Sequence, residues 1–576
     1  MKLAALEIKN FGCIGEEGIT IHIDNIVVLI GANNSGKSTV LKAYEAFSGT
    51  GEPLEETWFH RERKNVPVEI IGTFVEISNE DIEKIKTTKW IYDDTEFGKC
   101  IRVKWQWNSP GSKGQKYSWD NSIGDWKEGG MGGFDSLISS CVPTPLTIRP
   151  TDSSKDIESK ILEILTSAVK EKVKNDSTKV DGLINEFIKI AEEVQKEIAT
   201  TIEETFDNLK DKLDKVFPDH EILIKPSAGK IEPEKVIGAG SHVRIKDPLG
   251  ESYPLSQQGT GLQRTFIWTA IGALAEIGRY KQGKKTISPE EPRILLVEEP
   301  EVFLHPPAIR AAREALYSLA EVSGWQVMVT THSPIFIDVS KPHTTIIRVE
   351  RDASKGSKIF STEKAQFDGD ERDRLRMIRS CHPTVNEFFF ADHVILVEGE
   401  TEHAVLNSLL ASNQNPNLNI HVVNCMGKAN IPLFVKILNH FGTTYTILHD
   451  SDSPKVRRDG NWVTNSMWTI NKRIAEVVSE RDKNLPSCFS ITHIPDFEQY
   501  YFGYLQKGDK PFHAIKIIHQ DDFETNPQFE KLRLLLKNII EHNHPYQYSS
   551  YEELCNFVLE WVENNNPEEP EKWEIE

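Results

Sequence analysis

The chain has 576 residues, of which 38% are hydrophobic and 27% charged, and its formal net charge is −20. That length exceeds what one hydrophobic core supports, so two or three globular domains are expected rather than a disordered chain. The negative charge disfavours non-specific binding to a polyanion, although carboxylates that hold metal ions would contribute to it. No apolar run reaches transmembrane length and no signal-peptide pattern opens the chain, so we expect a cytoplasmic protein with no membrane partner.

Residues 1–150 predict the first part of an ATPase domain. An apolar run at 26–30 predicts a buried strand, and GANNSGKST (31–39) follows it with the P-loop pattern, opening a segment of helical spacing at 31–47. Backbone N–H groups of such a loop bind phosphates, its lysine reaches the β- and γ-phosphates, and its hydroxyl ligates Mg²⁺. The predicted nucleotide-binding residues are Gly31, Asn33, Asn34, Ser35, Gly36, Lys37, Ser38 and Thr39, with Ser38 as a metal ligand.

The composition changes sharply after this strand-rich part. Its Gly-rich stretch GDWKEGGMGGFD (124–135) predicts a surface loop. From 152 to 216, apolar residues recur at helical spacing among Glu and Lys, which predicts amphipathic helices. Two interpretations stay open for these helices: an inserted arm that serves dimerisation, or an ordinary helical layer that covers a sheet.

Strands and helices alternate again from 218 to 375, which is typical of a largely parallel α/β sheet. The expected strands are 221–225, 243–246, 294–297 and 327–330, and the expected helices are 261–280 and 308–323.

Polar residues follow two of these strands. Glu298 and Glu299 end the apolar strand ILLV, where the first would join the Mg²⁺ shell and the second would polarise the attacking water. His332 follows the next strand in THSP and is a candidate contact of the γ-phosphate.

LSQQGTGLQR (255–264) places a serine and glycines before a predicted helix, a second helix start suited to phosphate. This stretch resembles the signature motif of ABC-type ATPases, and EEPEVFLHP with THSP resembles the Walker B, D-loop and H-loop region of their SMC-like and DNA-repair branch. The resemblance implies that Ser256, Gly259 and Gly261 complete the ATP site of a partner protomer in a head-to-head dimer. The P-loop helix is followed by no Q-loop glutamine, and His60 or no residue takes that place.

Acidic residues follow successive strands in the last third of the chain. ADHVILVEGETEHAVL (391–406) ends an apolar strand with Glu398, and Glu402 lies four residues later; the strand 445–449 and the stretch IPDFE (494–498) also end in acidic residues. Each pattern alone is also typical of a helix start or a surface loop, but together they suit Mg²⁺ or Mn²⁺, which prefer oxygen ligands and activate water at a phosphodiester. The predicted metal ligands are Glu398, Glu402, Asp450, Asp452 and Glu498.

VEGETE with HDSD resembles a Toprim domain, and its place after an SMC-like ATPase resembles the OLD (overcoming lysogenization defect) family of ATP-dependent nucleases. The resemblance spans almost the whole chain except about 50–230. It implies catalytic roles for Glu398 and Asp450, and a lysine that assists the scissile phosphate, with Lys510 as the candidate and Lys507 as its neighbour to exclude. Gly427-Lys428 corresponds to a glycine turn of the Toprim sheet, either near the metals or a plain strand-to-helix turn.

The predicted fold is α/β: an N-terminal ABC-type P-loop ATPase head with a helical insertion, then a C-terminal Toprim domain. Its expected parts are 1–150 with Walker A, 151–217 as the insertion, 218–375 with the signature, Walker B and H-loop, and 376–576 as the Toprim domain. The charged segment 351–390 predicts a linker, and the polar tail 564–576 predicts a frayed end.

Together these features predict an ATP-regulated DNA endonuclease that uses Mg²⁺ or Mn²⁺ to nick or cut both strands, as a homodimer or larger oligomer formed through its heads and insertion. The resemblance also implies anti-phage defence, alone, with a retron reverse transcriptase and its ncRNA/msDNA, or in a Gabija-like pair with a helicase. Two alternatives stay open: an SMC-like DNA-binding ATPase with a non-catalytic Toprim module, and an RNA-cleaving Toprim nuclease. The basic clusters 61–64 and 455–458 are either phosphate contacts or solvated loops.

Overall fold

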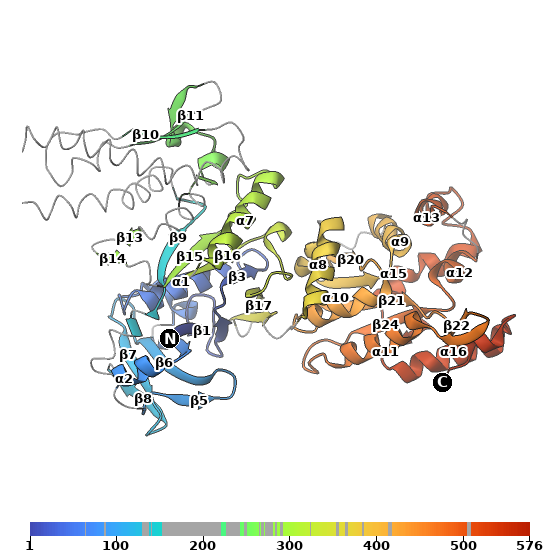
Figure 1. The fold of residues 1–576 in the computed structure, drawn as a ribbon, viewed down its shortest axis with the longest axis horizontal. Coiled ribbons are helices and arrows are strands. Elements are labelled where there is room, and N and C mark those ends of the chain that lie inside the picture. The colour runs from blue at the N-terminus through green and yellow to red at the C-terminus, as the bar shows by residue number, and fades with distance from the viewer. Residues whose placement is uncertain are drawn as a thin grey trace, which may run out of the picture. The chain divides into compact units, whose positions relative to one another are not determined.

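The structure, a computed structural model, shows two compact units (Figure 1), each of which is described by itself. The first comprises Met1–Asp338 with His343–Ile359, and the second comprises Val339–Pro342 with Phe360–Glu576. The helical segment expected at 151–217 lies almost entirely outside the described residues, as does most of the helix expected at 261–280. The described residues are 1–63, 65–85, 88–129, 138–139, 141–152, 221–225, 242–246, 250–263, 265–266, 270, 280–282, 285–287, 292–322, 324–352, 356–362, 367–382, 385–412, 418–503 and 508–575.

A six-stranded sheet with parallel inner strands organises the first unit. Every residue of its two central strands is buried, as expected where both faces of a parallel sheet are covered. Parallel pairing places the P-loop, the two glutamates after 297 and the THSP loop at one edge, because each follows the carboxyl end of a strand. The order is β18 (Gly356–Ser361), β17 (Thr344–Asp352), β3 (Ile26–Ile30), β16 (Trp325–Thr330), β15 (Arg293–Glu298) and β9 (Thr144–Ile148).

An antiparallel sheet packs with the first one around α1 (Lys37–Ser48), whose buried side chains join those of both sheets in a single core. The first part of the stretch expected as a surface loop at 124–135 is a strand of this sheet, paired with the strand before it, and 130–135 lie outside the described residues. The order is β2 (Ile19–His22), β1 (Lys2–Lys9), β4 (Val68–Val75), β6 (Gly98–Trp107), β7 (Gln115–Asp120) and β8 (Asp125–Glu128), with β5 (Tyr92–Asp94) on β6.

The remaining described elements of the first unit are small, apart from α7 (Pro306–Glu321), which contacts β16. This helix begins two residues before its expected start, because His305 caps it and Pro306 suits a first helical position. The others are α2 (Asn79–Ile85), the three-stranded sheet β10 (Glu221–Lys225), β11 (His242–Lys246) and β12 (Ser252–Pro254), and the hairpin β13 (Tyr280–Gln282) with β14 (Lys285–Ile287).

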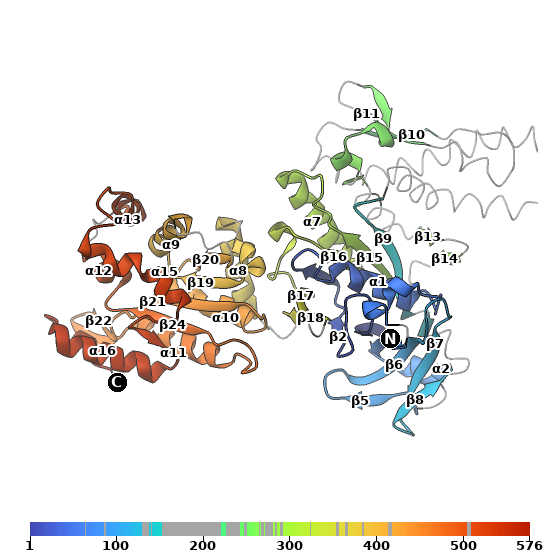
Figure 2. The same ribbon diagram turned by 180° about the vertical axis from the view of Figure 1, so that it is seen from behind.

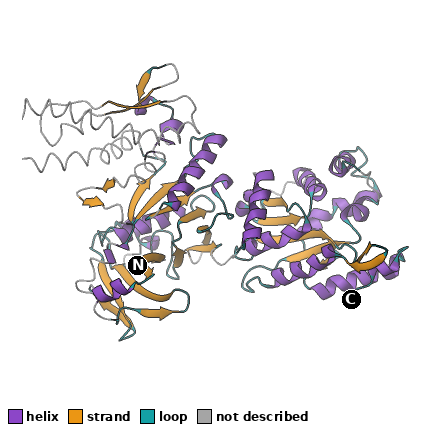
Figure 3. Ribbon diagram, in the orientation of Figure 1, coloured by secondary structure: helices purple, strands orange, loops and turns teal. Residues whose placement is uncertain are grey.

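The second unit is a five-stranded sheet with helices on both sides (Figures 2 and 3). Its first four strands are parallel and its last is antiparallel. The strand order is β20 (Ile420–Asn424), β19 (His393–Val397), β21 (Thr444–Asp450), β24 (Phe489–His493) and β25 (Gln547–Tyr548). A separate hairpin, β22 (Lys455–Arg458) with β23 (Asn461–Thr464), follows β21.

Two apolar clusters hold most of the described helices of the second unit in place. One joins the sheet to the helices that follow β19 and β24, and the other joins β25, α11 and the last helix. The helices are α8 (Gly369–Cys381), α9 (Glu400–Ser412), α10 (Ile431–Leu438), α11 (Ser466–Ser479), α12 (Phe497–Phe502), α13 (Lys510–Ile518), α14 (Glu530–Arg533), α15 (Leu535–Ile540) and α16 (Tyr551–Asn565).

Two expectations about irregular segments are wrong. The segment 351–390 contains β18 and α8, and α8 starts at a capping box in which Asp368 and Glu371 each accept a hydrogen bond from the backbone N–H of the other. The tail 564–576 is anchored because Trp573 is buried and its ring lies 4.8 Å from that of Trp561. Among the described helices, none combines the length and apolar character that crossing a membrane requires.

Candidate functional site

The P-loop turns sharply between β3 and α1. Gly31, Asn34 and Gly36 have φ angles of 143°, 61° and 117°, so α1 begins at Lys37, later than the helical spacing predicted. Glycine is required at position 36, because a Cβ there would lie 2.6 Å from Sγ of Cys13. The turn leaves backbone N–H groups at the start of the helix, where an anion binds.

Lys37 is folded back onto its own loop. Its Nζ donates to the carbonyl oxygens of Gly31 and Ala32, both at 3.0 Å, and lies 2.9 Å from Nε2 of His332. Burial lowers the pKa of Lys37, and the carboxylate of Glu299 opposes that shift. Burial and then the Lys37 ammonium lower the pKa of His332, so a neutral imidazole faces the lysine.

The loop that carries His332 is held by Glu301, a residue that the sequence motifs did not single out. Glu301 Oε1 accepts a hydrogen bond from the backbone N–H of His332 at 2.6 Å, and its Oε2 accepts one from Thr331 Oγ1 at 2.8 Å. His332 Nε2 also lies 3.8 Å from Oε1 of Glu299. The structure therefore brings Lys37, Glu299 and His332 together at the carboxyl edge of the parallel sheet.

Glu298 lies between Ser38 on α1 and Arg149, a basic residue that no sequence motif singled out. Its Oε2 accepts a hydrogen bond from Ser38 Oγ at 3.0 Å, and its Oε1 lies 3.5 Å from Nε of Arg149. Arg149 directly follows β9, which pairs in parallel with β15 and so ends beside Glu298. The Arg149 guanidinium also donates to both oxygens of Glu45 on α1, each at 2.9 Å. Arg149 thus contacts Glu298. His60, the residue predicted for the missing Q-loop position, has its Nδ1 2.9 Å from the carbonyl oxygen of Gly12.

The signature residues lie in a turn that leads into a helical segment. Ser256 and Gly259 are exposed and Gly261 is half-buried. The side-chain amide of Gln263 donates to the carbonyl oxygens of Gln258 at 2.7 Å and Ser256 at 3.3 Å, which ties the turn to the residues after it. Their role toward a partner protomer stays a prediction.

In the second unit, the carboxyl ends of β19 and β21 bring Glu398 and Asp450 into contact. The two strands are paired in parallel, and the backbone N–H of Asp450 donates to Glu398 Oε1 at 2.7 Å. Asp450 Oδ1 in turn accepts a hydrogen bond of 2.8 Å from the backbone N–H of Phe497, the first residue of α12. Three segments distant in sequence thus converge on this edge of the sheet.

Burial and like charge together perturb three carboxyl groups here. Burial raises the pKa of Glu398 to about 7 and that of Glu402 to about 7. Burial also raises the pKa of Asp450, and the charges of Glu398 and Glu402 raise it further. Carboxylates in such a place repel one another unless a cation joins them.

Glu498 and Lys510 adjoin the same cluster. Lys510 Nζ lies 3.0 Å from Oε1 of Glu498, and the charge of Glu498 helps to raise the pKa of Glu402. Burial lowers the pKa of Lys510, but the hydrogen bond and charge of Glu498, together with the charge of Asp496, raise it overall. Lys507, the alternative to Lys510, lies outside the described residues.

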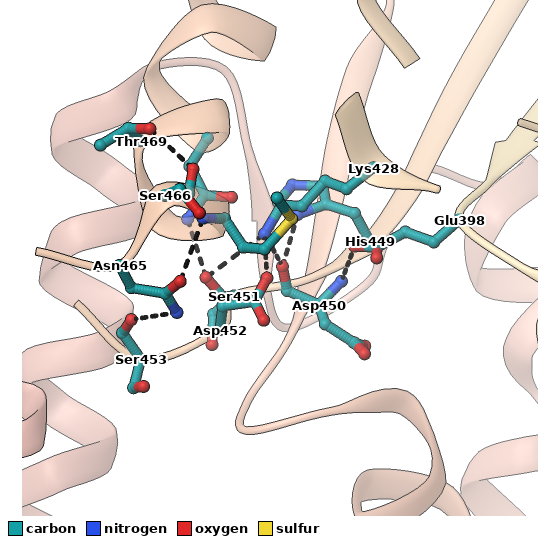
Figure 4. A network of polar contacts seen from close by, with 12 residues as sticks. Glu398, Lys428, His449, Asp450, Ser451, Asp452, Ser453, Asn465, Ser466 and Thr469 are labelled. Carbon is teal, nitrogen blue, oxygen red and sulfur yellow. Dashed lines mark hydrogen bonds and ion pairs between the residues drawn. The ribbon is translucent and has the colours of Figure 1, made fainter. Parts of the chain in front are cut away.

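Lys428 follows β20, and its side chain reaches the loop that follows β21 (Figure 4). Its Nζ donates to the carbonyl oxygen of Asp450 and to Asp452 Oδ2 at 2.7 Å, and lies 3.4 Å from the carbonyl oxygen of Ser451. Figure 4 shows the Lys428 side chain extending to this loop, whereas the Asp450 carboxylate points away from it. Of the two interpretations of Gly427-Lys428, the structure therefore favours a position at the carboxylate cluster.

The donor set fits a hard divalent cation. Glu398, Glu402 and Asp450 offer only oxygen atoms, and burial together with the charges of neighbouring carboxylates raises the pKa of each. As the side chains of the described residues are placed, no three acidic, histidine or cysteine groups stand close enough to enclose an ion. Glu398 and Asp450 are instead held by backbone N–H groups, so these donors are what an arriving metal ion would displace.

A P-loop ATPase joined to a Toprim domain is the class of protein that this fold and these two sites define. The family model described as an AAA ATPase domain matches residues 1–124 and 144–337, more than half of the chain. The model described as the TOPRIM domain of overcoming lysogenization defect protein-like proteins matches residues 389–452. The chain belongs to the family described as AAA ATPase domain and carries a Toprim domain of the OLD-like kind, so both the expected resemblance to the OLD family and the expected fold class are confirmed.

Two relatives match half of the chain or more. The Old nuclease of Escherichia phage P2 is 26% identical over 471 residues, which cover 78% of this chain and 77% of that protein. The OLD nuclease of Thermus scotoductus is 25% identical over 313 residues, covering 51% of this chain and 54% of the relative. Among solved structures, an Smc head bound to the C-winged helix domain of ScpA matches with a TM-score of 0.42 and 16% identity, covering 64% of this chain and all of that one.

Proposed function

We propose that this chain is an ATP-regulated, divalent-metal-dependent DNA endonuclease whose cleavage site is the carboxylate cluster of the second unit. The observation that carries the proposal is the convergence of Glu398, Glu402 and Asp450 at the carboxyl edge of a parallel sheet, where Glu402 is buried and the other two are half-buried. Buried like charges are costly without a cation, and their conjunction with perturbed pKa values is typical of functional sites. The names of the phage P2 and Thermus relatives support the same reaction.

Glu398, Glu402 and Asp450 would hold Mg²⁺ or Mn²⁺, with Asp452 and Glu498 as further ligands. Such an ion activates water and stabilises the oxygen that leaves a phosphodiester. Lys510 is the only candidate cation for the scissile phosphate that the sequence named and the structure describes; its Nζ lies beside Glu498 and its side chain is half-exposed. The protein's own contribution is to bury and orient these carboxylates, which β19, β21 and α12 do through the hydrogen bonds to Glu398 and Asp450.

The first unit would supply the regulation. Lys37 and the P-loop amides bind the nucleotide phosphates, Ser38 and Glu298 hold the Mg²⁺ of ATP, and Glu299 with His332 face the reacting phosphate. Ser256, Gly259 and Gly261 would complete the site of a second protomer, which makes the active form a dimer or larger oligomer. We place the protein in the cytoplasm, as an anti-phage defence effector that acts alone or with a partner.

The test is cleavage of supercoiled plasmid DNA in Mg²⁺ or Mn²⁺ by the wild type and by Glu398→Gln. We expect the variant to lose roughly a hundredfold or more of the cleavage rate, since even residues that merely support metal ligands cost 10- to 100-fold when removed. Thermal melting checks that the variant is folded. Equal cleavage by both proteins would refute the proposed cleavage site. Cleavage of RNA but not of DNA would show that RNA is the substrate.

A further inference from the structure

Lys428 is a buried cation in direct contact with one of the candidate metal ligands. Its side chain is 1% exposed, and its Nζ lies 2.7 Å from Oδ2 of Asp452. The ammonium group has three hydrogens, and its three neighbours are Asp452 and the carbonyl oxygens of Asp450 and Ser451. No hydrogen is left over for a substrate, so Lys428 is placed to act on the protein rather than on a phosphate.

The surroundings fix this lysine and the loop it contacts. The side-chain amides of Asn471 and Asn465 donate to the carbonyl oxygens of Ser451 at 2.8 Å and Ser453 at 2.9 Å (Figure 4 shows the second bond). These bonds hold the backbone of the loop without Lys428. The contact with Asp452 is therefore not needed merely to shape the loop, and it places a positive charge where a metal ion would have to bind that carboxylate.

A cation at this position also acts on the neighbouring carboxylate. Lys428 Nζ donates to the carbonyl oxygen of Asp450, and the backbone N–H of the same residue donates to the Glu398 carboxylate, so the positive charge lies close to that carboxylate. Lys428 thus balances part of the charge of the cluster while no metal is bound. Because Asp452 is 32% exposed at its side chain, an ion from solvent can reach it once the lysine releases it.

We propose that Lys428 is an internal counter-cation that occupies Asp452 in the metal-free protein and competes with the divalent ion for that ligand. Lys428 is thus a positioning residue, and it sets how tightly the cluster binds metal. This inference rests on the proposed metal site and adds a determinant that opposes metal binding. It predicts that removing a positive charge at 428 tightens metal binding, which is the reverse of what loss of a purely structural residue does.

The experiment is a calorimetric titration of Mn²⁺ into the nucleotide-free chain, for wild type, Lys428→Gln, Lys428→Arg and Asp452→Asn. Glutamine keeps hydrogen-bond donors for the loop carbonyls but removes the charge, and arginine keeps the charge. We expect Lys428→Gln to bind Mn²⁺ roughly tenfold more tightly, since releasing a carboxylate from a charged hydrogen bond is of that order. Lys428→Arg should stay within about twofold of wild type, because it retains the charge whose loss causes the effect.

A double-mutant cycle keeps the test decisive if one variant is unstable. Asp452→Asn should weaken Mn²⁺ binding more in the Lys428→Gln background than in the wild type, because Asp452 is available to metal only after the lysine is removed. Lys436→Gln, which breaks the ion pair of Lys436 with Glu371 elsewhere in the unit, is the matched control and should leave Mn²⁺ affinity unchanged.

The outcomes separate the two proposals. Weaker or unchanged Mn²⁺ binding by Lys428→Gln, or additive effects in the cycle, overturns the role of Lys428 while leaving the metal site in place. A wild-type chain that binds no Mn²⁺ in the absence of nucleotide refutes the metal site itself, and with it the proposed function.

Discussion

Arg149 shows how one side chain links three elements of the nucleotide site. It follows β9, lies 3.5 Å from Glu298 at the end of β15, and bonds Glu45 on α1. Glu45 holds the guanidinium in place, and its positive charge faces Glu298, the glutamate that would join the Mg²⁺ shell. Its positive charge at the phosphate-binding edge also suits the developing charge of ATP hydrolysis.

We therefore expect Arg149→Ala to lower the rate of ATP hydrolysis roughly tenfold, the size of effect expected for the loss of one charged hydrogen bond. Steady-state phosphate release measures it. The control is Arg102→Ala, which removes another Arg–Glu contact, that of Arg102 Nη2 with Glu7 at 2.6 Å on the antiparallel sheet. Equal rates for Arg149→Ala and wild type would show that Arg149 has no part in the site.

His393 makes the stability of the second unit depend on pH. It is buried at the start of β19, with its ring nitrogens 2.8 Å from Thr444 Oγ1 and 3.0 Å from Thr446 Oγ1, and burial lowers its pKa to about 4. An unfolded histidine has a pKa near 6.5, so the unfolded chain binds a proton first as the pH falls. Stability is thus unaffected above about pH 6.5 and is lost progressively between about 6.5 and 4.

The buried histidines should lower the melting temperature of the nucleotide-free chain over this pH range, whereas the raised pKa values of Glu398 and Glu402 act in the opposite direction, so the effect of His393 is measured against a variant that lacks it. Each such histidine removes about 1.4 kcal/mol of unfolding free energy for every pH unit by which its folded pKa lies below its unfolded pKa. His421 and His544, whose pKa values burial also lowers to about 4, add to the effect. His393→Gln should melt lower than wild type at about pH 7.5 but with a shallower dependence on pH. An identical pH dependence of the melting temperature in both proteins would show that His393 does not make stability depend on pH.

At the scale of elements, the pattern of strands and strand ends was readable from the sequence. Continuous apolar runs such as HVILV and IVVLI predict buried parallel strands, and polar residues directly after them lie at one edge because parallel strands all end there. The contacts of Arg149 and Lys428 could not be predicted from the sequence. Arg149 meets Glu298 only because β9 pairs with β15, a strand far along the chain, and no local pattern encodes that pairing.

The predictions for two irregular segments were wrong for a related reason. The charged stretch 351–390 looked like a linker because its helix α8 buries few residues, whereas a capping box of two acidic residues starts it. The tail looked frayed because polar residues dominate it, whereas one tryptophan, Trp573, packs it against α16. In both cases one or two side chains outweigh the composition of the segment.

The hairpin β22–β23 is the element that we expect to contact the DNA backbone. It directly follows Asp450-Ser-Asp452, and its exposed tip carries Arg457, whose guanidinium lies 5.9 Å from the ring centroid of Trp462, and Arg458. The third basic residue of the hairpin, Lys455, pairs with Glu574 at 2.9 Å. Arginines and an aromatic ring are typical contacts of phosphates and bases.

Arg458→Glu should therefore weaken binding of a fluorescein-labelled DNA duplex and make it less dependent on salt. The logarithmic slope should change by about 0.9 for each phosphate that the variant no longer neutralises. Fluorescence anisotropy at several salt concentrations measures both properties. The control Lys483→Glu makes the same charge change in the exposed turn before β24, at the opposite edge of the sheet. If the two variants bind alike, the hairpin is a solvated loop.

On the scale of the whole molecule, two chemistries share one chain. The P-loop unit holds groups for a nucleotide and the Toprim unit holds groups for a metal and a phosphodiester, so each can be removed separately. Lys37→Ala should abolish ATP hydrolysis, because Nζ is the group that reaches the phosphates, and should leave Mn²⁺ binding by the nucleotide-free chain unchanged.

Plasmid cleavage by Lys37→Ala should also lose its response to added ATP, whereas the wild type should respond. Cleavage assays with and without ATP, run beside the calorimetric titration, measure both properties. A Lys37→Ala protein whose cleavage still follows ATP would mean that the nucleotide acts somewhere other than the P-loop.

The most direct test of the central claim is anomalous diffraction at the manganese edge from crystals of the chain soaked in Mn²⁺ without nucleotide. If these side chains hold the metal, a peak should lie in the second unit within roughly 2 to 2.4 Å of carboxylate oxygens of Glu398, Glu402 and Asp450. Manganese bound elsewhere in the second unit, or no peak at these carboxylates at saturating Mn²⁺, would contradict it.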